Sequence, residues 1–168
     1  MRFRSEKDQE YYDYIKEHIS NVKKAFDIFG KSLCSKAHVP LSVVEDLVKN
    51  HDVSKFSEEE FEGYRQWFYP RNGEAGDPEI FDKAWEHHYT VNKHHPEHYV
   101  QDDGTAEKMP DMYVVEMLLD WAAMSMRAKN YPSDWYEKEK NRLVFHSETR
   151  KFVEALLPIL GHHEVFRG

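Results

Sequence analysis

Hydrophobic residues recur at helical spacing along most of the chain. In the first thirty residues they lie three or four positions apart, at Ile15, Ile19, Val22, Phe26 and Phe29. This spacing predicts an amphipathic helix that Ser5 caps and that ends at Gly30. No segment alternates apolar and polar residues in the manner of a strand, so the pattern predicts an all-α fold.

The same periodicity predicts further helices over about 40–51, 57–68, 78–95 and 111–130, and one or two over 134–160. Pro40 and Pro78 suit the first turns of their helices. Ser57 and Glu60 have the spacing of a capping box for the short helix that ends near residue 68. No composition shift marks a domain boundary, and 168 residues can bury one good core, so we expect a single domain over 1–168.

Several polar residues lie on apolar helix faces. With a rotation of about 100° per residue, the face of Phe81 includes Trp85, His88, Asn92 and His95, whereas His87 and His94 point to solvent. His18 lies beside the first apolar stripe, and His51 and Asp52 follow the second helix at its end. Asp120 lies on the face of Tyr113, Met117 and Met124, where the methionines are expected in the core. Since burying an unpaired carboxylate costs several kcal/mol, Asp120 should have a cation or strong hydrogen-bond donors nearby.

Composition and charge narrow the chemistry. The 23 basic and 31 acidic residues give a net charge of −8, which argues against nucleic acid and anionic membranes as partners. A single cysteine fits a cytoplasmic protein, and neither a signal peptide nor a membrane span is evident. Histidine is abundant, with 11 residues, and its neutral imidazole is the commonest metal ligand. Nitrogen and oxygen ligands without thiolate favour Mn, Fe, Co, Ni or Zn.

Three strings carry a family resemblance: "HDVSKF", "WEHHYTVNKHHPEHY" and "MLLDWAAMS". The order His18, His51-Asp52, Asp120 resembles the H…HD…D ligand pattern of the HD-domain metal-dependent phosphohydrolase superfamily, with Ser54 in place of a common glycine. The chain is also similar to a family of small uncharacterised HD-like proteins of bacteria and phages. The resemblance covers about residues 10–130, and C-terminal helices over 131–168 would complete an HD-type helical bundle.

The resemblance implies a phosphohydrolase that acts on a nucleotide or other small phosphomonoester through a metal-activated water. The metal ligands would be His18, His51, Asp52 and Asp120, and Asp52 would also contact the attacking water. His88 or His95 would protonate the leaving group or bind a second metal. The structural alternative is that both histidines are hydrogen-bonded core residues, linked through Asn92.

The candidate substrate-binding residues are indicated less specifically than the metal ligands. Lys55 could hold a phosphate oxygen or pair with a carboxylate such as Glu58. Arg127 lies one heptad after Asp120 and could hold an anion or form a surface ion pair, and Asn92 could contact the substrate. His87, His94 and His98 are expected on a solvated helix face and loop.

Two other functions stay open. Some HD-fold proteins hold two irons in the order H…HD…H…H…D and act as oxygenases, an order that this chain shows if His88 and His95 both bind metal. A non-catalytic nucleotide-binding module is the second alternative. A helical bundle without any binding or catalytic function is the remaining one. Either a monomer or a homodimer is compatible with the acidic, aromatic-rich composition.

Overall fold

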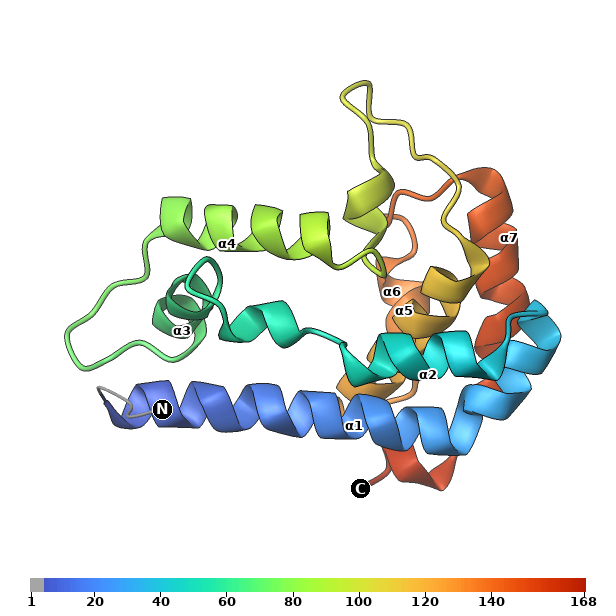
Figure 1. Cartoon of the computed structure of the whole chain (residues 1–168), viewed down its shortest axis with the longest axis horizontal. Helices are drawn as coiled ribbons and strands as arrows, with labels where there is room; N and C mark the ends of the chain where they lie inside the picture. Colours follow the sequence, from blue (N-terminus) through green and yellow to red (C-terminus); the bar gives the residue numbers. More distant parts are fainter. Residues whose placement is uncertain (1–4) are drawn as a thin grey trace. The chain divides into compact units, whose positions relative to one another are not determined.

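The computed structural model describes residues 5–168, which contain seven α-helices and four short 3-10 helices (Figure 1). The α-helices are α1 (Glu6–Ala37), α2 (Leu41–Lys49), α3 (Phe61–Phe68), α4 (Pro78–Val91), α5 (Asp111–Ala128), α6 (Pro132–Glu139) and α7 (Ser147–Leu156). The 3-10 helices are η1 (Val53–Phe56), η2 (Pro96–Tyr99), η3 (Leu157–Ile159) and η4 (Glu164–Phe166). Among the described residues, β pairing is limited to an isolated bridge between Val100 and Ala106. The predicted all-α fold is confirmed.

The chain divides into two compact units. Unit 1 comprises the chain up to Ile19 together with Asp52–Asn92, and unit 2 comprises Ser20–His51 and Lys93–Gly168. The prediction of one domain over 1–168, which includes four residues outside the described part, stays a prediction. None of the helices within residues 5–168 has the length and apolarity that crossing a membrane requires.

Unit 1 has a small aromatic core. Tyr11 and Ile15 of α1 are buried with Tyr64 of α3 and Ala84 of α4. Helices α3 and α4 approach closely at Gly63, where an added Cβ would lie 2.7 Å from the Cβ of Ala84. A glycine at this position therefore allows the two backbones to approach.

A buried cation supports this core. The guanidinium of Arg65 is enclosed by carboxylates of Asp8, Glu62 and Glu74, and its Nη2 donates to Glu74 Oε1 at 2.8 Å. A buried charge is tolerable only when it is paired in this way.

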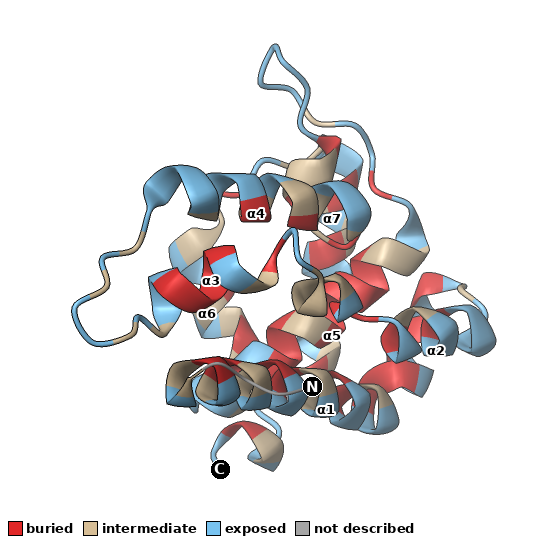
Figure 2. Cartoon of the chain, turned by 60° about the vertical axis from the view of Figure 1, so that its left-hand side comes forward, coloured by how far each residue is buried: buried red, intermediate tan, exposed pale blue. Residues whose placement is uncertain are grey.

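Unit 2 is built around α5. Ten of its residues are buried, from Val114 to Ser125, and the red stretches of α5 in Figure 2 mark them. Helices α2, α6 and α7 and the 3-10 helix η4 contact α5 within this unit. Such burial on nearly all sides explains why the α5 sequence is apolar beyond one stripe. The expected core position of Met124 is wrong, because its side chain is 44% exposed.

The first helix begins as predicted but ends later. Ser5 Oγ accepts from the backbone N–H of Asp8, as expected of a cap. Helix α1 then passes through Gly30 and continues to Ala37, after which His38 adopts a positive φ of 55°. A Cβ at position 30 would lie 2.7 Å from the Phe26 ring, so Gly30 gives space to an aromatic side chain within the helix.

Two other helix boundaries differ from prediction. Glu60 makes no side-chain capping bond and α3 begins at Phe61, so the capping box of Ser57 and Glu60 is wrong. Helix α4 begins at Pro78 as predicted but ends at Val91 rather than at residue 94 or 95. Asn92 has extended backbone angles, with φ −107° and ψ 95°.

Candidate functional site

His51 and Asp52 lie just beyond the end of α2, as predicted. The helix ends at Lys49, and His51 and Asp52 are each only 1% exposed. Asp52 has a left-handed backbone with φ 55°, a conformation that aspartate adopts more readily than most residues. The division between the two units falls at the peptide bond that joins His51 to Asp52.

In unit 1 the Asp52 carboxylate faces two buried imidazoles. Its Oδ2 lies 3.5 Å from His18 Nε2, on α1, and its Oδ1 lies 3.4 Å from His88 Nε2, on α4. Two ligands that bind one ion at about 2.1 Å are separated by about 3.0–3.5 Å. Each oxygen of Asp52 therefore has one histidine nitrogen at a separation close to that of two ligands of one ion.

Lys55 and Asn92 also lie in this part of unit 1. Lys55 Nζ pairs with Asp52 Oδ2 at 2.8 Å, and its side chain is 18% exposed. Asp52 is thus a carboxylate partner of Lys55, in agreement with the alternative in which this lysine pairs with a nearby carboxylate. Asn92 Nδ2 donates to Ser54 Oγ at 2.7 Å and to the His88 carbonyl oxygen at 2.9 Å, which ties the end of α4 to η1.

Sequence reasoning missed the functional position of Glu60. This fully buried carboxylate accepts from His88 Nδ1 at 2.8 Å and from His87 Nδ1 at 2.7 Å. His87 therefore has a carboxylate partner, and its side chain is 34% exposed rather than fully solvated. The only local signal at Glu60 was its spacing from Ser57, which suggested a cap.

The charges of Glu60 and His88 depend on each other. Burial would raise the pKa of Glu60, but hydrogen bonds from His88, Ser54 and His87 hold it below the usual value. Burial would lower the pKa of His88, but its bonds to Asp52 and Glu60 raise it overall. In the metal-free protein both shifts favour an ionised Glu60 beside a protonated His88.

In unit 2 the Asp120 carboxylate has a similar environment. Its Oδ1 lies 3.6 Å from His51 Nε2, and its Oδ2 lies 3.6 Å from His94 Nε2. The Asp120 side chain is 13% exposed, whereas both histidines are fully buried. These two imidazoles are consistent with the expectation that Asp120 has a cation or strong donors nearby.

A second carboxylate of unit 2, Glu116, contacts the other nitrogen of both rings. Glu116 Oε1 accepts from His51 Nδ1 at 2.9 Å and lies 3.3 Å from His94 Nδ1. Burial would raise the pKa of Glu116, but hydrogen bonds from His51 and His94 hold it below the usual value. Glu116 precedes Asp120 by four residues on α5, and this helical spacing was a signal that could have revealed it.

His94 is the main correction to the predicted site. It was expected in solvent, yet it is buried, and its ring centroid lies 4.4 Å from that of His51. The rotation argument fails here because α4 ends at Val91, three residues earlier. His95 is partly buried beside His94, with ring centroids 4.2 Å apart, and precedes Pro96 with extended backbone angles.

The remaining predicted residues lie elsewhere in unit 2. Arg127 is exposed in the last turn of α5, in contrast to the buried Ala123 one turn earlier. His98 is partly buried in η2, where its ring contacts Tyr99, so it does not lie in a solvated loop.

Among the described residues, one cluster could hold an ion with ligands that all belong to one unit. It comprises His51, His94 and Glu116 of unit 2. Their ligand atoms lie within 4.8 Å of one another, and all three residues are buried. Buried histidine and carboxylate groups of this protein could therefore hold a metal ion.

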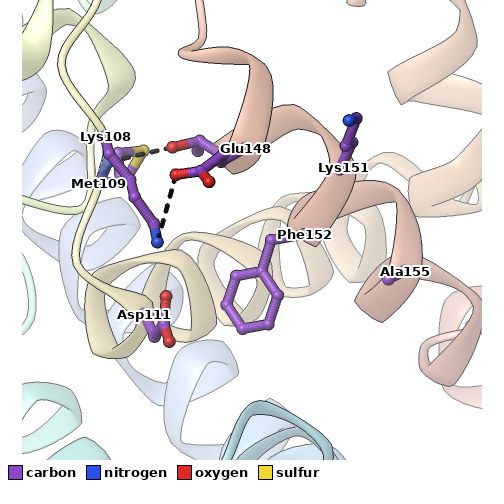
Figure 3. A pocket seen from close by; sticks show the side chains of 8 residues that line it. Lys108, Met109, Asp111, Glu148, Lys151, Phe152 and Ala155 are labelled. Atoms are coloured by element: carbon purple, nitrogen blue, oxygen red, sulfur yellow. Dashed lines mark hydrogen bonds and ion pairs between the residues drawn. The ribbon is translucent and has the colours of Figure 1, made fainter.

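A pocket elsewhere in unit 2 has a different character. Figure 3 shows Phe152 of α7 between charged side chains, with Lys108 paired to Glu148 at 3.5 Å. Met109 N–H donates to Thr149 Oγ1 at 3.0 Å at its edge. None of the predicted site residues lines this pocket.

Comparisons with known proteins give a family but no activity. No curated protein and no solved structure matches the chain. Residues 7–159 match the model of DUF5662, described as a family of unknown function, and the chain therefore belongs to that family.

Proposed function

We propose that this protein is a metal-dependent phosphohydrolase that acts on a nucleotide or other small phosphomonoester. The observation that carries the proposal is found separately in each unit: a largely buried aspartate faces two imidazole Nε2 atoms, one near each oxygen. Asp52 meets His18 and His88 at 3.4–3.5 Å. Each carboxylate oxygen of Asp120 lies 3.6 Å from the Nε2 of a different histidine, His51 or His94.

The proposed ligands of the principal ion are His18, His51, Asp52 and Asp120. Their order along the chain is that of the HD superfamily, and the bond between His51 and Asp52 keeps two of the Cα atoms about 3.8 Å apart. Imidazole nitrogen and carboxylate oxygen together suit Mn, Fe, Co, Ni or Zn. When bound, such an ion lowers the pKa of a water and polarises a phosphoryl oxygen.

Residues of unit 1 would handle the substrate and its protons. Asp52 would orient the attacking water, and His88, held through Nδ1 by Glu60, would protonate the leaving group. Lys55 is the cation paired with Asp52, and it would hold a phosphoryl oxygen as a point charge. The proposal keeps His95, Asn92 and Arg127 as further candidates for contacts with the substrate.

Phosphate release with a panel of metals tests the proposal. Nucleotides and small phosphomonoesters are supplied with Mn, Co, Ni, Mg or Zn, and release should depend on one of these ions. Asp120→Asn should abolish release and metal binding, because it removes a ligand charge. Asp111→Asn, at the exposed start of the same helix, is the matched control. Metal-independent release, or full activity of Asp120→Asn, would contradict the proposal.

A di-iron oxygenase is the second candidate, and the histidine count favours it. Asp52 and Asp120 each face two imidazoles, which supplies four histidines and two carboxylates, enough for two ions. In the di-iron alternative, His94 is the metal ligand at the position in the ligand order for which His95 was expected. Two irons per chain with oxygen uptake and no phosphate release would favour the oxygenase. Nucleotide binding without turnover would favour a binding module.

A further inference from the structure

We propose that Glu116 is a positioning residue, which keeps His51 and His94 protonated at Nδ1 so that both Nε2 atoms present lone pairs toward Asp120. The inference deepens the proposed function, since it rests on metal binding at these histidines. It concerns residues of unit 2 alone and names a role for a glutamate outside the H…HD…D pattern.

The contacts of Glu116 define the arrangement. One oxygen, Oε1, is 2.9 Å from His51 Nδ1 and 3.3 Å from His94 Nδ1. The opposite nitrogens of the two rings are each 3.6 Å from Asp120, on different oxygens. The rings are inclined by 30° with centroids 4.4 Å apart, so both can direct Nδ1 to one carboxylate and Nε2 to another.

Hydrogen-bond chemistry then selects the tautomer. An ionised carboxylate only accepts hydrogen bonds, so each ring must carry its proton on Nδ1 to donate to Glu116. A neutral imidazole has one such proton, which leaves a lone pair on Nε2, the form that binds a metal. Carboxylates on the outer nitrogen of metal-binding histidines commonly fix the ring in this way.

A packing role alone does not account for Glu116. The residue is buried on α5, and a carboxylate there costs free energy unless donors compensate it. Leucine or methionine would fill the space of a helix core without that cost.

Unit 1 contains a similar pair. Glu60 accepts from His88 Nδ1 at 2.8 Å, and His88 Nε2 lies 3.4 Å from Asp52. Each unit thus has a buried glutamate on one side of a histidine and an aspartate on the other. The repeated arrangement supports one part of the inference, namely that a buried glutamate orients a histidine ring so that its Nε2 faces an aspartate.

Nitrogen NMR of the metal-free protein is the first test. Long-range proton–nitrogen spectra distinguish the two neutral tautomers and the imidazolium. At a pH at which the rings are neutral, both His51 and His94 should carry their proton on Nδ1 in the unaltered protein. Glu116→Gln weakens the acceptor, and Glu116→Met removes it, so the Nε2-protonated form should increase in that order. Nε2-protonated rings in the unaltered protein, or no change in Glu116→Met, would overturn the inference.

Metal affinity is the second test. Calorimetric titration with Zn or Mn should show a loss of roughly 10–100-fold for Glu116→Gln, the usual effect of removing a supporting carboxylate. Glu154→Gln is the control, because Glu154 of α7 accepts from Tyr136 instead of a histidine. Circular dichroism confirms that each variant is folded, and unchanged affinity in folded Glu116→Gln would overturn the inference.

These readouts separate the inference from the proposed activity. The tautomers are measured without metal or substrate, so they test Glu116 even if no phosphate ester is hydrolysed. A protein with the expected tautomers and metal affinity but no turnover would refute the phosphohydrolase and leave the role of Glu116 intact. Anomalous scattering that places the ion on Glu116 itself would overturn the positioning role.

Discussion

The buried histidines have closely related surroundings. His51 and His88 each donate from Nδ1 to a glutamate and direct Nε2 toward an aspartate, although they belong to different units. The aspartates were predicted because Asp52 follows an apolar helical pattern and Asp120 lies on the apolar face of one. The glutamates escaped prediction because their histidine partners are more than 20 residues away in the sequence, with Glu60 and His88 separated by 28 positions.

Lys55 supplies a prediction at this scale. Lys55→Ala should raise KM more than it lowers kcat, because a point charge on a phosphoryl oxygen contributes mainly to binding. Steady-state kinetics with the best phosphomonoester measures the split. Lys49→Ala is the control, since Lys49 pairs with exposed carboxylates of its own helix. A fall in kcat with unchanged KM would assign Lys55 to the chemical step instead.

At the scale of elements, helix ends determine which side chains reach the candidate residues. The early end of α4 at Val91 allows His94 to turn inward, and the end of α2 releases His51 and Asp52 from helical geometry. Periodicity located most helix starts, because caps and prolines are local signals. The ends were less predictable, since Gly30 serves packing instead of termination.

The contact between α3 and α4 gives a prediction for Gly63. Gly63→Ala would place a Cβ 2.7 Å from the Ala84 Cβ and 2.9 Å from the Ile80 carbonyl oxygen. Overpacking of this kind typically costs about 1–3 kcal/mol, so the free energy of unfolding should fall. Urea denaturation followed by circular dichroism measures the change.

Gly30→Ala is the matched comparison. There the three atoms nearest to the added Cβ all belong to the Phe26 ring, and alanine favours a helix by about 1 kcal/mol over glycine. We expect a smaller loss, or none, at position 30. A Gly63→Ala variant as stable as the unaltered protein would show that the two helices can separate at little cost.

At the scale of the whole molecule, the described chain has two cores of different composition. The core of unit 1 is small and aromatic and adjoins the ion pairs of Arg65, whereas that of unit 2 is larger, mainly aliphatic and centred on α5. Because unit 1 includes more buried charge beside less apolar material, its stability should depend more strongly on pH.

Glu74 makes this dependence specific. Hydrogen bonds from Arg65 and from the Arg71 backbone lower its pKa from 4.5 to about 2. A depressed pKa stabilises the fold fully above pH 4.5, and that contribution disappears as pH falls toward 2. Thermal unfolding should therefore show a lower Tm through this window.

Glu74→Gln is the variant that isolates this contribution. It should lower Tm at neutral pH and make the decline between pH 4.5 and 2 shallower, because the titrating group is gone. Glu148→Gln, with an exposed ion pair to Lys108, should leave the decline unchanged. Identical pH profiles for Glu74→Gln and the unaltered protein would refute the role of this carboxylate.

The sequence by itself determined the helical class, most helix starts, and the inward direction of His18, His51, Asp52, His88 and Asp120. These follow from local periodicity and from the cost of burying polar groups without partners. Only the tertiary structure decided that His94 is buried and that Glu60 and Glu116 hold histidine Nδ1 atoms. The physical reason is that helical rotation stops at a helix end, and contacts between distant segments depend on packing that no local pattern encodes.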